Sequence, residues 1–256
     1  MKKRYYFNLI CLGMTTCWLL AIVVACTEQP TAVSPTLAKI SSPSKNTRRS
    51  NNADFIQFIL QQANISNQKI LQQRQQFQQL ITQKDSLSPA QQRWLVQLAR
   101  YFHVKNFSVQ TANDWKILLK RVDIIPNSLT IAQAINESAW GRSRFAQQGN
   151  NFFGQWCYQP GCGIVPNQRA ANKHYEVARY DNALDSVRSY MLNLNSFHVY
   201  QVLRNKRYQL RQNHQAISGL VLASTLRYYS TRRGDYVRSI RAIILRYNLT
   251  QYDNLN

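Results

Sequence analysis

The stretch LTIAQAINESAWGRSRFAQQGNNFFGQW, residues 129–156, decides the fold. Its first half repeats apolar residues at helical spacing, Ser128 stands near its start, and Gly141 is placed to end the helix. Glu137, one of only three glutamates in the chain, falls in the last turn, close to Trp140. We therefore predict a helix that presents one carboxylate to a loop rich in aromatic residues.

The position of Glu137 predicts a raised pKa for its carboxyl group. A carboxylate in the last turn faces the negative end of the helix dipole, and burial against Trp140 and Phe153 acts in the same direction. A carboxylic acid that keeps its proton near neutral pH suits general-acid cleavage of a glycosidic bond. The alternative is a solvated helix glutamate paired with Arg142 or Arg144.

Helical periodicity recurs on both sides of this stretch, which indicates a mainly α domain. Ser88 with Pro89, and Thr111, mark the starts of two further helices. From residue 152 to about 180 the chain is rich in Gly, Pro and aromatic residues, so loops and a short hairpin are expected there. The helical patterns cover residues 55–81 (with a candidate break at 64–67), 88–98, 111–119, 126–141, 183–191, 199–210 and 236–249.

The N-terminus has the pattern of an export signal. Residues 2–4 are basic, an apolar stretch follows over 9–25, and Cys26 comes directly after it. The run VVAC at 23–26 resembles a bacterial lipobox, which implies a signal peptide over residues 1–25 and lipidation of Cys26. An uncleaved signal or a transmembrane helix is the competing interpretation, although two threonines interrupt the apolar stretch.

The chain after the signal divides into a tether and one domain. Residues 26–53 contain three prolines and many Ser, Thr and Asn, so we expect a disordered tether there. Residues 54–256 carry enough large apolar residues for one core, and we expect a single catalytic domain, present as a monomer. Thr27 after the lipidated cysteine resembles the pattern sent to the outer membrane, so we expect the protein on the periplasmic side of the envelope.

The charge of the chain favours polyanionic partners. The formal net charge is +21, and it remains +18 when the basic residues of the signal are left out. Nucleic acid is a usual partner for such an excess, but export argues against it. Lipopolysaccharide phosphates, anionic lipids and the carboxylates of peptidoglycan stem peptides are the polyanions of the envelope. A basic surface that only maintains solubility is the alternative.

Two cysteines remain in the predicted domain. Cys157 and Cys162 are separated by four residues that include Pro160 and Gly161, so in an oxidising compartment they are candidates for a disulfide across a tight loop. Metal binding is the alternative, but no second cysteine pair follows and the histidines show no metal-site spacing. We expect no metal and no cofactor.

Three segments carry a family resemblance. AQAINESAWGRSRFA at 132–146, NNFFG at 150–154 and VRSYMLNLN at 187–195 resemble, in this order, the glucosaminidase-domain proteins of glycoside hydrolase family 73, and most closely the bacterial Bax proteins within it. The resemblance implies a lysozyme-like helical domain with a small β-hairpin lobe. It also implies hydrolysis of the β-1,4 bond after N-acetylglucosamine in peptidoglycan, with Glu137 as the catalytic acid.

The second catalytic group has several candidates. Glu176 follows the irregular insert where the family places a β-lobe carboxylate, whereas Asp181 is better explained as a helix cap. The run YSTRRGDY resembles a family motif with an active-site tyrosine, which makes Tyr229 a catalytic candidate and Tyr236 a binding candidate. Catalysis assisted by the acetamido group of the sugar would remove the need for a second carboxylate.

Sugar binding requires flat apolar faces with a few amide groups nearby. Trp140, Phe153 and Trp156 supply such faces, and we expect Phe153 and Trp156 to act as a pair. Asn151 is expected to support Glu137. The same features allow two other functions, a lytic transglycosylase and a non-catalytic glycan-binding protein held at the envelope.

Overall fold

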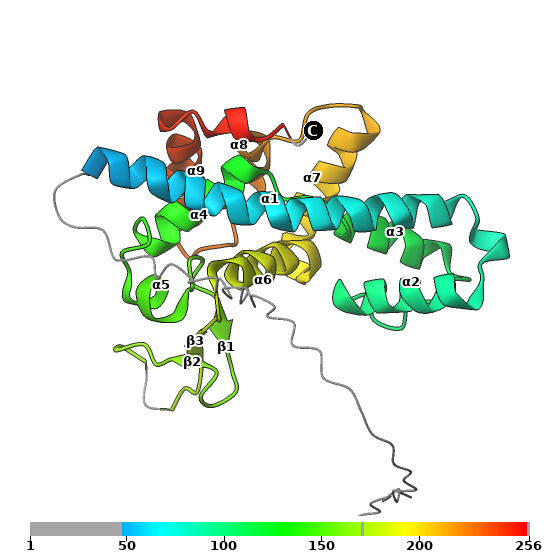
Figure 1. The fold of residues 1–256 in the computed structure, drawn as a ribbon, viewed down its shortest axis with the longest axis horizontal. Helices are drawn as coiled ribbons and strands as arrows, with labels where there is room; N and C mark the ends of the chain where they lie inside the picture. Colours follow the sequence, from blue (N-terminus) through cyan, green and yellow to red (C-terminus); the bar gives the residue numbers. More distant parts are fainter. Residues whose placement is uncertain (1–47, 170–171, 255–256) are drawn as a thin grey trace, which may run out of the picture. The chain divides into compact units, whose positions relative to one another are not determined.

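The helix that carries Glu137 lies behind the long blue N-terminal helix in Figure 1, with other helices packed against it. The computed structural model describes residues 48–169 and 172–254. The mainly α fold with a small sheet is confirmed. In chain order the elements are α1 (Arg48–Ile81), η1 (Lys84–Ser86), α2 (Pro89–Tyr101), α3 (Ala112–Arg121), α4 (Asn127–Ser138), α5 (Arg144–Gly149), β1 (Trp156–Cys157), β2 (Gly163–Ile164), β3 (Glu176–Ala178), α6 (Ala183–Ser196), η2 (His198–Tyr200), α7 (Gln201–Gln212), α8 (Gly219–Leu222), η3 (Ala223–Thr225), α9 (Gly234–Arg246) and η4 (Leu249–Tyr252).

The sequence predictions for Cys26, the signal peptide and most of the tether fall on residues 1–47, outside the described residues. Helix α1 begins at Arg48, before the expected domain start at residue 54. Among the residues that the structure describes, no helix has both the length and the apolar character needed to cross a membrane.

Helix α4 is buried on almost all sides. Ten of its twelve residues are buried, and α1, α8, α9 and η4 pack against it. At its N-terminal end the Asp253 carboxylate accepts hydrogen bonds from Ser128 N (2.9 Å), Ser128 Oγ (2.7 Å) and Gly219 N (3.0 Å). A side chain at position 219 would overlap Ser128, since an added β-carbon would lie 2.2 Å from its hydroxyl oxygen. The start of α4 is therefore fixed by a segment from the C-terminal end of the chain.

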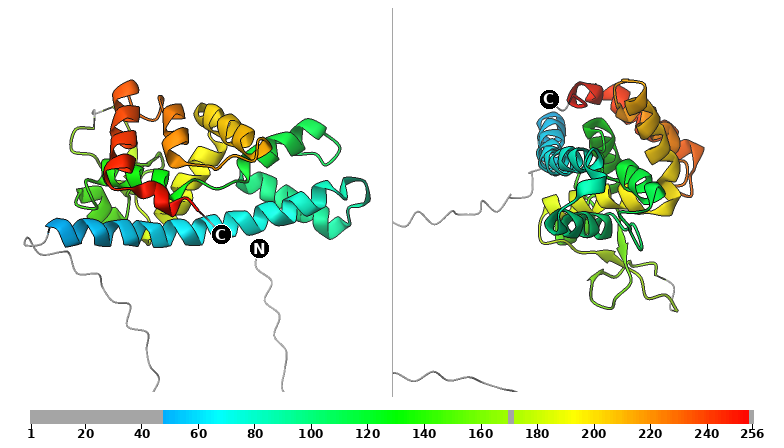
Figure 2. Two further views of the ribbon diagram at one scale, coloured as in Figure 1. Left: turned by 90° about the horizontal axis from the view of Figure 1, so that it is seen from above. Right: turned by 90° about the vertical axis from the view of Figure 1, so that its right-hand side faces the viewer.

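Helix α1 is one continuous helix that spans the other helices along one side (Figure 2). The candidate break at 64–67 is wrong because Asn67 is buried in a specific set of hydrogen bonds. Its Nδ2 donates to Ile125 O (2.8 Å) and Asn127 Oδ1 (3.0 Å), and its Oδ1 accepts from Ile125 N (3.1 Å). Asn67 therefore does not break α1; its side chain links α1 to the residues at the start of α4.

The helix boundaries expected from caps are partly confirmed. Ser88 and Gln91 form a capping box at the start of α2. Thr111 occupies the cap position of α3, but its side chain makes no capping hydrogen bond. Asn182, not Asp181, caps α6, and its Oδ1 accepts from Asp185 N (3.0 Å). The expectation for Asp181 is therefore wrong by one residue.

The irregular insert forms three short strands instead of one hairpin. Both β1 and β2 pair antiparallel with β3, which gives the order β1-β3-β2. Trp156 lies opposite Val177, and Gly163 lies opposite Ala178. The structure thus has a three-stranded sheet where a two-stranded hairpin was expected, with β3 between β1 and β2. Two short helices, α5 and α8, carried no signal in the sequence analysis.

A buried cluster of charges holds the end of α3 against α1 and α7. The Asp123 carboxylate accepts from Arg211 Nε (2.7 Å) and Nη2 (2.6 Å), and it lies 3.5 Å from Arg74 Nη1 and 3.6 Å from Arg207 Nε. Arg207 Nη2 also donates to Lys120 O (2.8 Å). Burial alone would raise the Asp123 pKa, but the charges of Arg207, Arg211 and Arg74 outweigh it and lower the pKa.

We predict that Asp123→Asn destabilises the fold by about 3–5 kcal/mol, because it leaves buried arginines without a counter-charge. Asp185→Asn, which breaks an exposed pair with Arg188, should cost no more than about 0.5 kcal/mol. The lowered pKa means that the Asp123 contribution is present above the pKa of an unfolded aspartate and is lost as the pH falls through the folded value. Urea unfolding of both variants across pH tests this, and equal losses in the two would contradict it.

Candidate active site

Glu137 lies in the last turn of α4, as predicted, but the helix ends earlier than Gly141. Ala139 takes a left-handed conformation (φ 50°), and Trp140 (φ 63°) and Gly141 (φ 73°) follow with positive φ. Ser138 stabilises this turn, because its hydroxyl accepts from Gly141 N (2.7 Å) and donates to Ala134 O (2.6 Å). The chain thus turns away directly after Glu137 and leaves the carboxyl group at the helix end.

The Glu137 carboxyl group is half-buried against the loop that follows α5. Asn136 Nδ2 donates to its Oε1 (3.0 Å). Gly154 (φ 65°) lies beside Oε2, since a β-carbon on this glycine would be 3.9 Å from that atom. Burial raises the Glu137 pKa, and hydrogen bonding by Asn136 and Tyr236 and the charge of Arg232 oppose the rise without cancelling it. The predicted direction of the pKa shift is confirmed.

Asn151 holds the loop that faces Glu137. Its Nδ2 donates to Gln155 O (2.9 Å) and Ala178 O (2.8 Å), and its Oδ1 accepts from Gln155 N (3.1 Å) and Phe153 N (3.3 Å). This single buried side chain therefore ties residues 153–155 to strand β3. No direct hydrogen bond joins the Asn151 and Glu137 side chains in the described part of the chain, so the predicted support of Glu137 by Asn151 stays a prediction.

Tyr229 and Tyr236 stack on each other close to Glu137, with ring centroids 5.2 Å apart. Tyr236 is 1% exposed, and its hydroxyl accepts from Gln133 Nε2 (2.8 Å). Tyr229 is half-buried, and its hydroxyl donates to Phe153 O (3.1 Å). Burial, followed by neighbouring groups that include Glu137, raises the pKa of both phenols, so both keep their protons at neutral pH. Both are therefore protonated phenols rather than bases, and the Tyr229 O–H is already donated to Phe153 O.

The expected pair of open aromatic faces is not formed. Phe153 is 2% exposed and stacks on Tyr190, with centroids 4.0 Å apart. Trp156 is 54% exposed and stacks instead on Tyr175, at 4.3 Å. Phe153 is thus part of the core, because the buried Tyr190 of α6 covers its ring. Tyr175, which the sequence analysis did not select, completes the exposed platform on the small sheet.

Trp140 also differs from its expected role as an open sugar-binding face. It is half-buried and makes edge contacts with Phe55 of α1 (6.0 Å) and Tyr247 after α9 (5.0 Å). Its ring therefore helps to fix the turn that ends α4.

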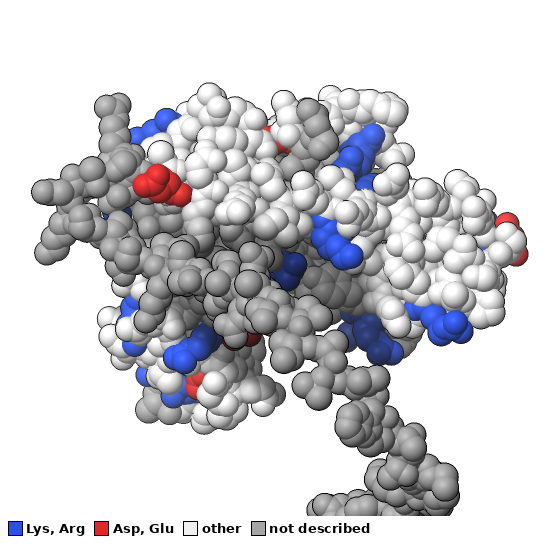
Figure 3. Space-filling model, viewed as in Figure 1, with Lys and Arg blue, Asp and Glu red and all other residues white. Residues whose placement is uncertain are grey.

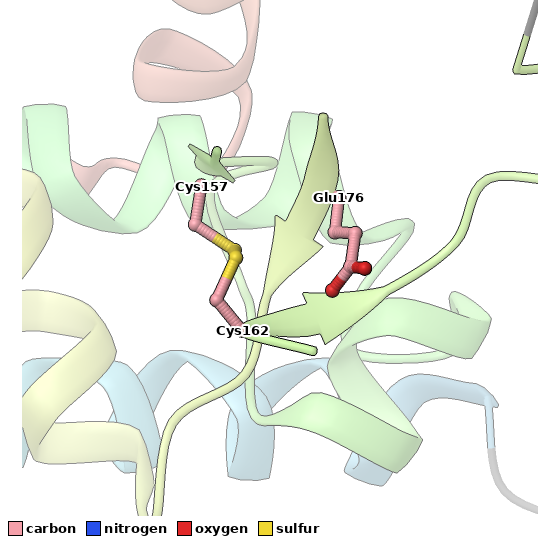
Figure 4. A group of neighbouring side chains, drawn as sticks. All are labelled: Cys157, Cys162 and Glu176. Carbon is pink, nitrogen blue, oxygen red and sulfur yellow. A yellow bond between two sulfur atoms is a disulfide. The ribbon is translucent and has the colours of Figure 1, made fainter. Parts of the chain in front are cut away.

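Glu176 lies in the small sheet beside a disulfide that joins Cys157 and Cys162 (Figure 4). Its carboxylate accepts from Gly161 N (3.1 Å) and Gly163 N (2.7 Å), and these two bonds lower its pKa. Both sulfur atoms lie near this carboxylate, but cysteines joined in a disulfide offer no thiolate to a metal ion. The geometry thus gives Glu176 an ionised state at neutral pH and a structural contact with the disulfide loop.

Comparison with known proteins identifies the family. Residues 112–249 match the glucosaminidase family, described as mannosyl-glycoprotein endo-beta-N-acetylglucosaminidase. This match covers more than half of the chain. The chain belongs to the glucosaminidase family. The matched residues include Glu137, Glu176, Tyr229 and Tyr236, whereas α1 and α2 lie outside them.

A relative with a curated name supports the same grouping. The chain is 34% identical over 149 residues to Protein bax of Escherichia coli (strain K12), with 58% of this chain and 53% of that protein aligned. The chain therefore spans about half the length of this relative. The family resemblance predicted from the three sequence segments is confirmed, and it makes this chain a member of a glycosidase family that binds glycans.

We predict that Glu137→Gln and Glu176→Gln change stability with opposite pH dependence. The raised Glu137 pKa means that the native protein loses stability as the pH rises from the unfolded glutamate pKa, about 4.3, through the folded value. Glu137→Gln removes that loss, so its stability relative to the native protein should rise with pH. Glu176 has a lowered pKa and contributes stability above the unfolded value, so Glu176→Gln should become relatively less stable as the pH rises.

Urea unfolding of the three proteins between pH 3 and pH 8 measures both trends. Parallel pH dependence of the two variants would contradict the assignment of the two carboxyl groups.

Proposed function

We propose that this protein is an endo-β-N-acetylglucosaminidase that cleaves the β-1,4 bond after N-acetylglucosamine in peptidoglycan strands. The proposal depends on one observation, the half-buried Glu137 carboxyl group with a raised pKa at the end of α4. A carboxylic acid of this kind protonates the leaving oxygen of a glycosidic bond. Membership of the glucosaminidase family supports the substrate class.

Glu176 is proposed as the group that activates water. The Glu176 pKa is lowered, whereas the Glu137 pKa is raised. In many enzymes, two carboxyl groups with pKa values shifted in opposite directions serve as the acid and the base. The bonds of Glu176 to Gly161 N and Gly163 N reduce its basicity, so attack by the acetamido group of the sugar remains the competing mechanism. Tyr229, a protonated phenol close to Glu137, is proposed to accept a hydrogen bond from the sugar, because its own O–H is already donated to Phe153 O.

The exposed stack of Trp156 on Tyr175 is proposed as a platform for a sugar ring. Stacked aromatic rings offer the flat apolar face that a pyranose requires. Asn151 is proposed as a positioning residue, because its four hydrogen bonds hold Gly154 beside Glu137.

Digestion of purified peptidoglycan, followed by borohydride reduction and mass spectrometry of the products, tests the activity. We predict reduced N-acetylglucosamine ends from the native protein and a rate about 10²- to 10⁴-fold lower with Glu137→Gln, the usual contribution of a general acid. Glu176→Gln should also lose activity, and azide should restore part of it if the missing group is a base, because azide replaces the attacking water. Unchanged activity in Glu176→Gln would favour assistance by the substrate, which needs no second carboxylate.

The products also separate the competing functions. Anhydro-muramic ends would assign a lytic transglycosylase, which shares the need for a single acid. Glycan binding without cleavage by the native protein would assign a binding protein. Reduced muramic acid ends would contradict the proposed bond specificity.

We also propose that the protein acts on the periplasmic side of the envelope, with a lipid anchor on Cys26 at the outer membrane. The basis is the sequence pattern around residues 23–26 together with the proposed substrate, which lies outside the cytoplasm. Labelled palmitate should enter the native protein and not Cys26→Ser, and the native protein should fractionate with outer membranes. Equal labelling of both proteins would contradict this.

A further inference from the structure

A cavity of about 420 Å³ lies between α3 and the η2–α7 segment, and none of its lining residues belongs to α4. Helices α3 and α7 pack side by side (Figure 1). The lining contains four cationic side chains, Lys116, Lys120, Arg121 and Arg204, and no carboxylate. Lys116 is exposed, Lys120 and Arg121 are half-buried, and Arg204 is only 5% exposed. The lining thus includes cations that range from exposed to almost fully buried.

These charges have no internal counter-charge among the described residues. Lys120 Nζ donates to the neutral Asn205 Oδ1 (2.8 Å). Arg204 Nη1 donates to Leu194 O (3.0 Å) and Phe197 O (2.8 Å), which fixes the guanidinium but does not neutralise it. Burial, with the nearby charges of Arg121 and Arg207, lowers the Arg204 pKa to about 10. A buried cation without an anionic partner is costly, so the fold retains here a charge that an external anion would stabilise.

The buried arginines around Asp123, unlike the cations of the cavity, have an internal counter-charge. There, Arg74, Arg207 and Arg211 surround one buried carboxylate. The whole chain has few acidic residues, and Lys and Arg side chains outnumber Asp and Glu on the face seen in Figure 3. The cavity differs from this general excess because four cations and no carboxylate line one half-open hollow.

We propose that this cavity binds the carboxylates of a peptide, namely the stem peptide carried by the glycan strand. Besides the cations, its lining includes the amide side chains of Asn113, Gln201 and Asn205 and the apolar Ile117. Amide groups both donate and accept, which matches a peptide backbone, whereas a free phosphate would use donors alone. The inference rests on the proposed function, since peptidoglycan is the substrate that joins such peptides to a glycan.

A chain of packed aromatic residues connects the cavity to the site at Glu137. His198, at the edge of the cavity, begins η2, and Tyr200 ends this turn. The Tyr200 ring packs against Tyr229 (5.9 Å), which in turn stacks on Tyr236. When the sugars of a glycan strand lie at Glu137, the cationic cavity on the other side of these tyrosines can receive the stem peptide. Binding at both places would raise affinity by making the second contact intramolecular.

Calorimetric titration of the full-length protein with synthetic L-alanyl-γ-D-glutamyl-diaminopimelate, in phosphate-free buffer, tests the proposal. We expect binding that weakens about tenfold, or about 1.4 kcal/mol, in the double variant Lys116→Gln/Lys120→Gln. The matched control Lys69→Gln/Lys206→Gln removes two exposed lysines outside the cavity and should bind as the native protein does. The same peptide with its carboxylates amidated should bind at least tenfold more weakly to the native protein.

Each outcome decides the proposal. Absence of peptide binding, or equal weakening in both double variants, would overturn it, as would binding of inorganic phosphate in preference to the peptide. The peptide contains no glycosidic bond, so this titration is independent of hydrolysis. A native protein that binds the peptide but releases no reduced N-acetylglucosamine ends would refute the proposed function alone.

Discussion

The burial of α4 is the constraint on which the geometry of the site depends. A helix covered on almost all sides must satisfy its free N–H and C=O groups inside the protein. Asp253 accepts from the first turn of α4, and the Ser138 hydroxyl links the last turn to the residues that follow. With both ends fixed in this way, the Glu137 side chain lies beside Gly154, which has no side chain to cover Oε2. The raised pKa is a consequence of this partial burial.

The same burial explains why a strongly basic protein needs specific internal anions. Asp123 compensates arginines that bond to the carbonyl groups at the end of α3, and Asp253 occupies the start of α4. Each of these carboxylates joins segments far apart in the sequence. Asp123 and Asp253 therefore have structural roles, and the Glu137 carboxyl group differs from that of Asp123 in having a raised pKa.

Local sequence signals predicted much of the fold and one part of the site. The period of the apolar residues and the Ser88 cap were sufficient for the main helices, and the place of Glu137 in the last turn followed from the same pattern. Tertiary contacts decided the rest. Asn67 forms hydrogen bonds with residues that lie 58 or more positions away in the sequence. Local sequence preferences alone therefore predicted a helix break at a residue that instead links α1 to the rest of the fold. The sequence near Asp181 did not show which of two adjacent polar residues would take the cap.

The aromatic residues were harder to assign because their neighbours, not their identity, determine exposure. Phe153 is covered by Tyr190 and Trp140 by Phe55 and Tyr247, from helices distant in sequence. Trp156 remained exposed because the short strand β1 lies on a small sheet with little to cover it. Tyr175 had no motif around it, and only the pairing of β1 with β3 brings it beside Trp156.

The measurement that tests the account most directly is a carbon-13 NMR titration of the side-chain carboxyl groups in glutamate-labelled protein. The chain has only three glutamates, Glu28, Glu137 and Glu176, so the spectrum is simple and Gln variants assign it. We expect Glu137 to titrate above the ordinary glutamate pKa of about 4.3 and Glu176 below it. A Glu137 signal that titrates at or below that value would contradict the claim that its burial at the end of α4 prepares a general acid.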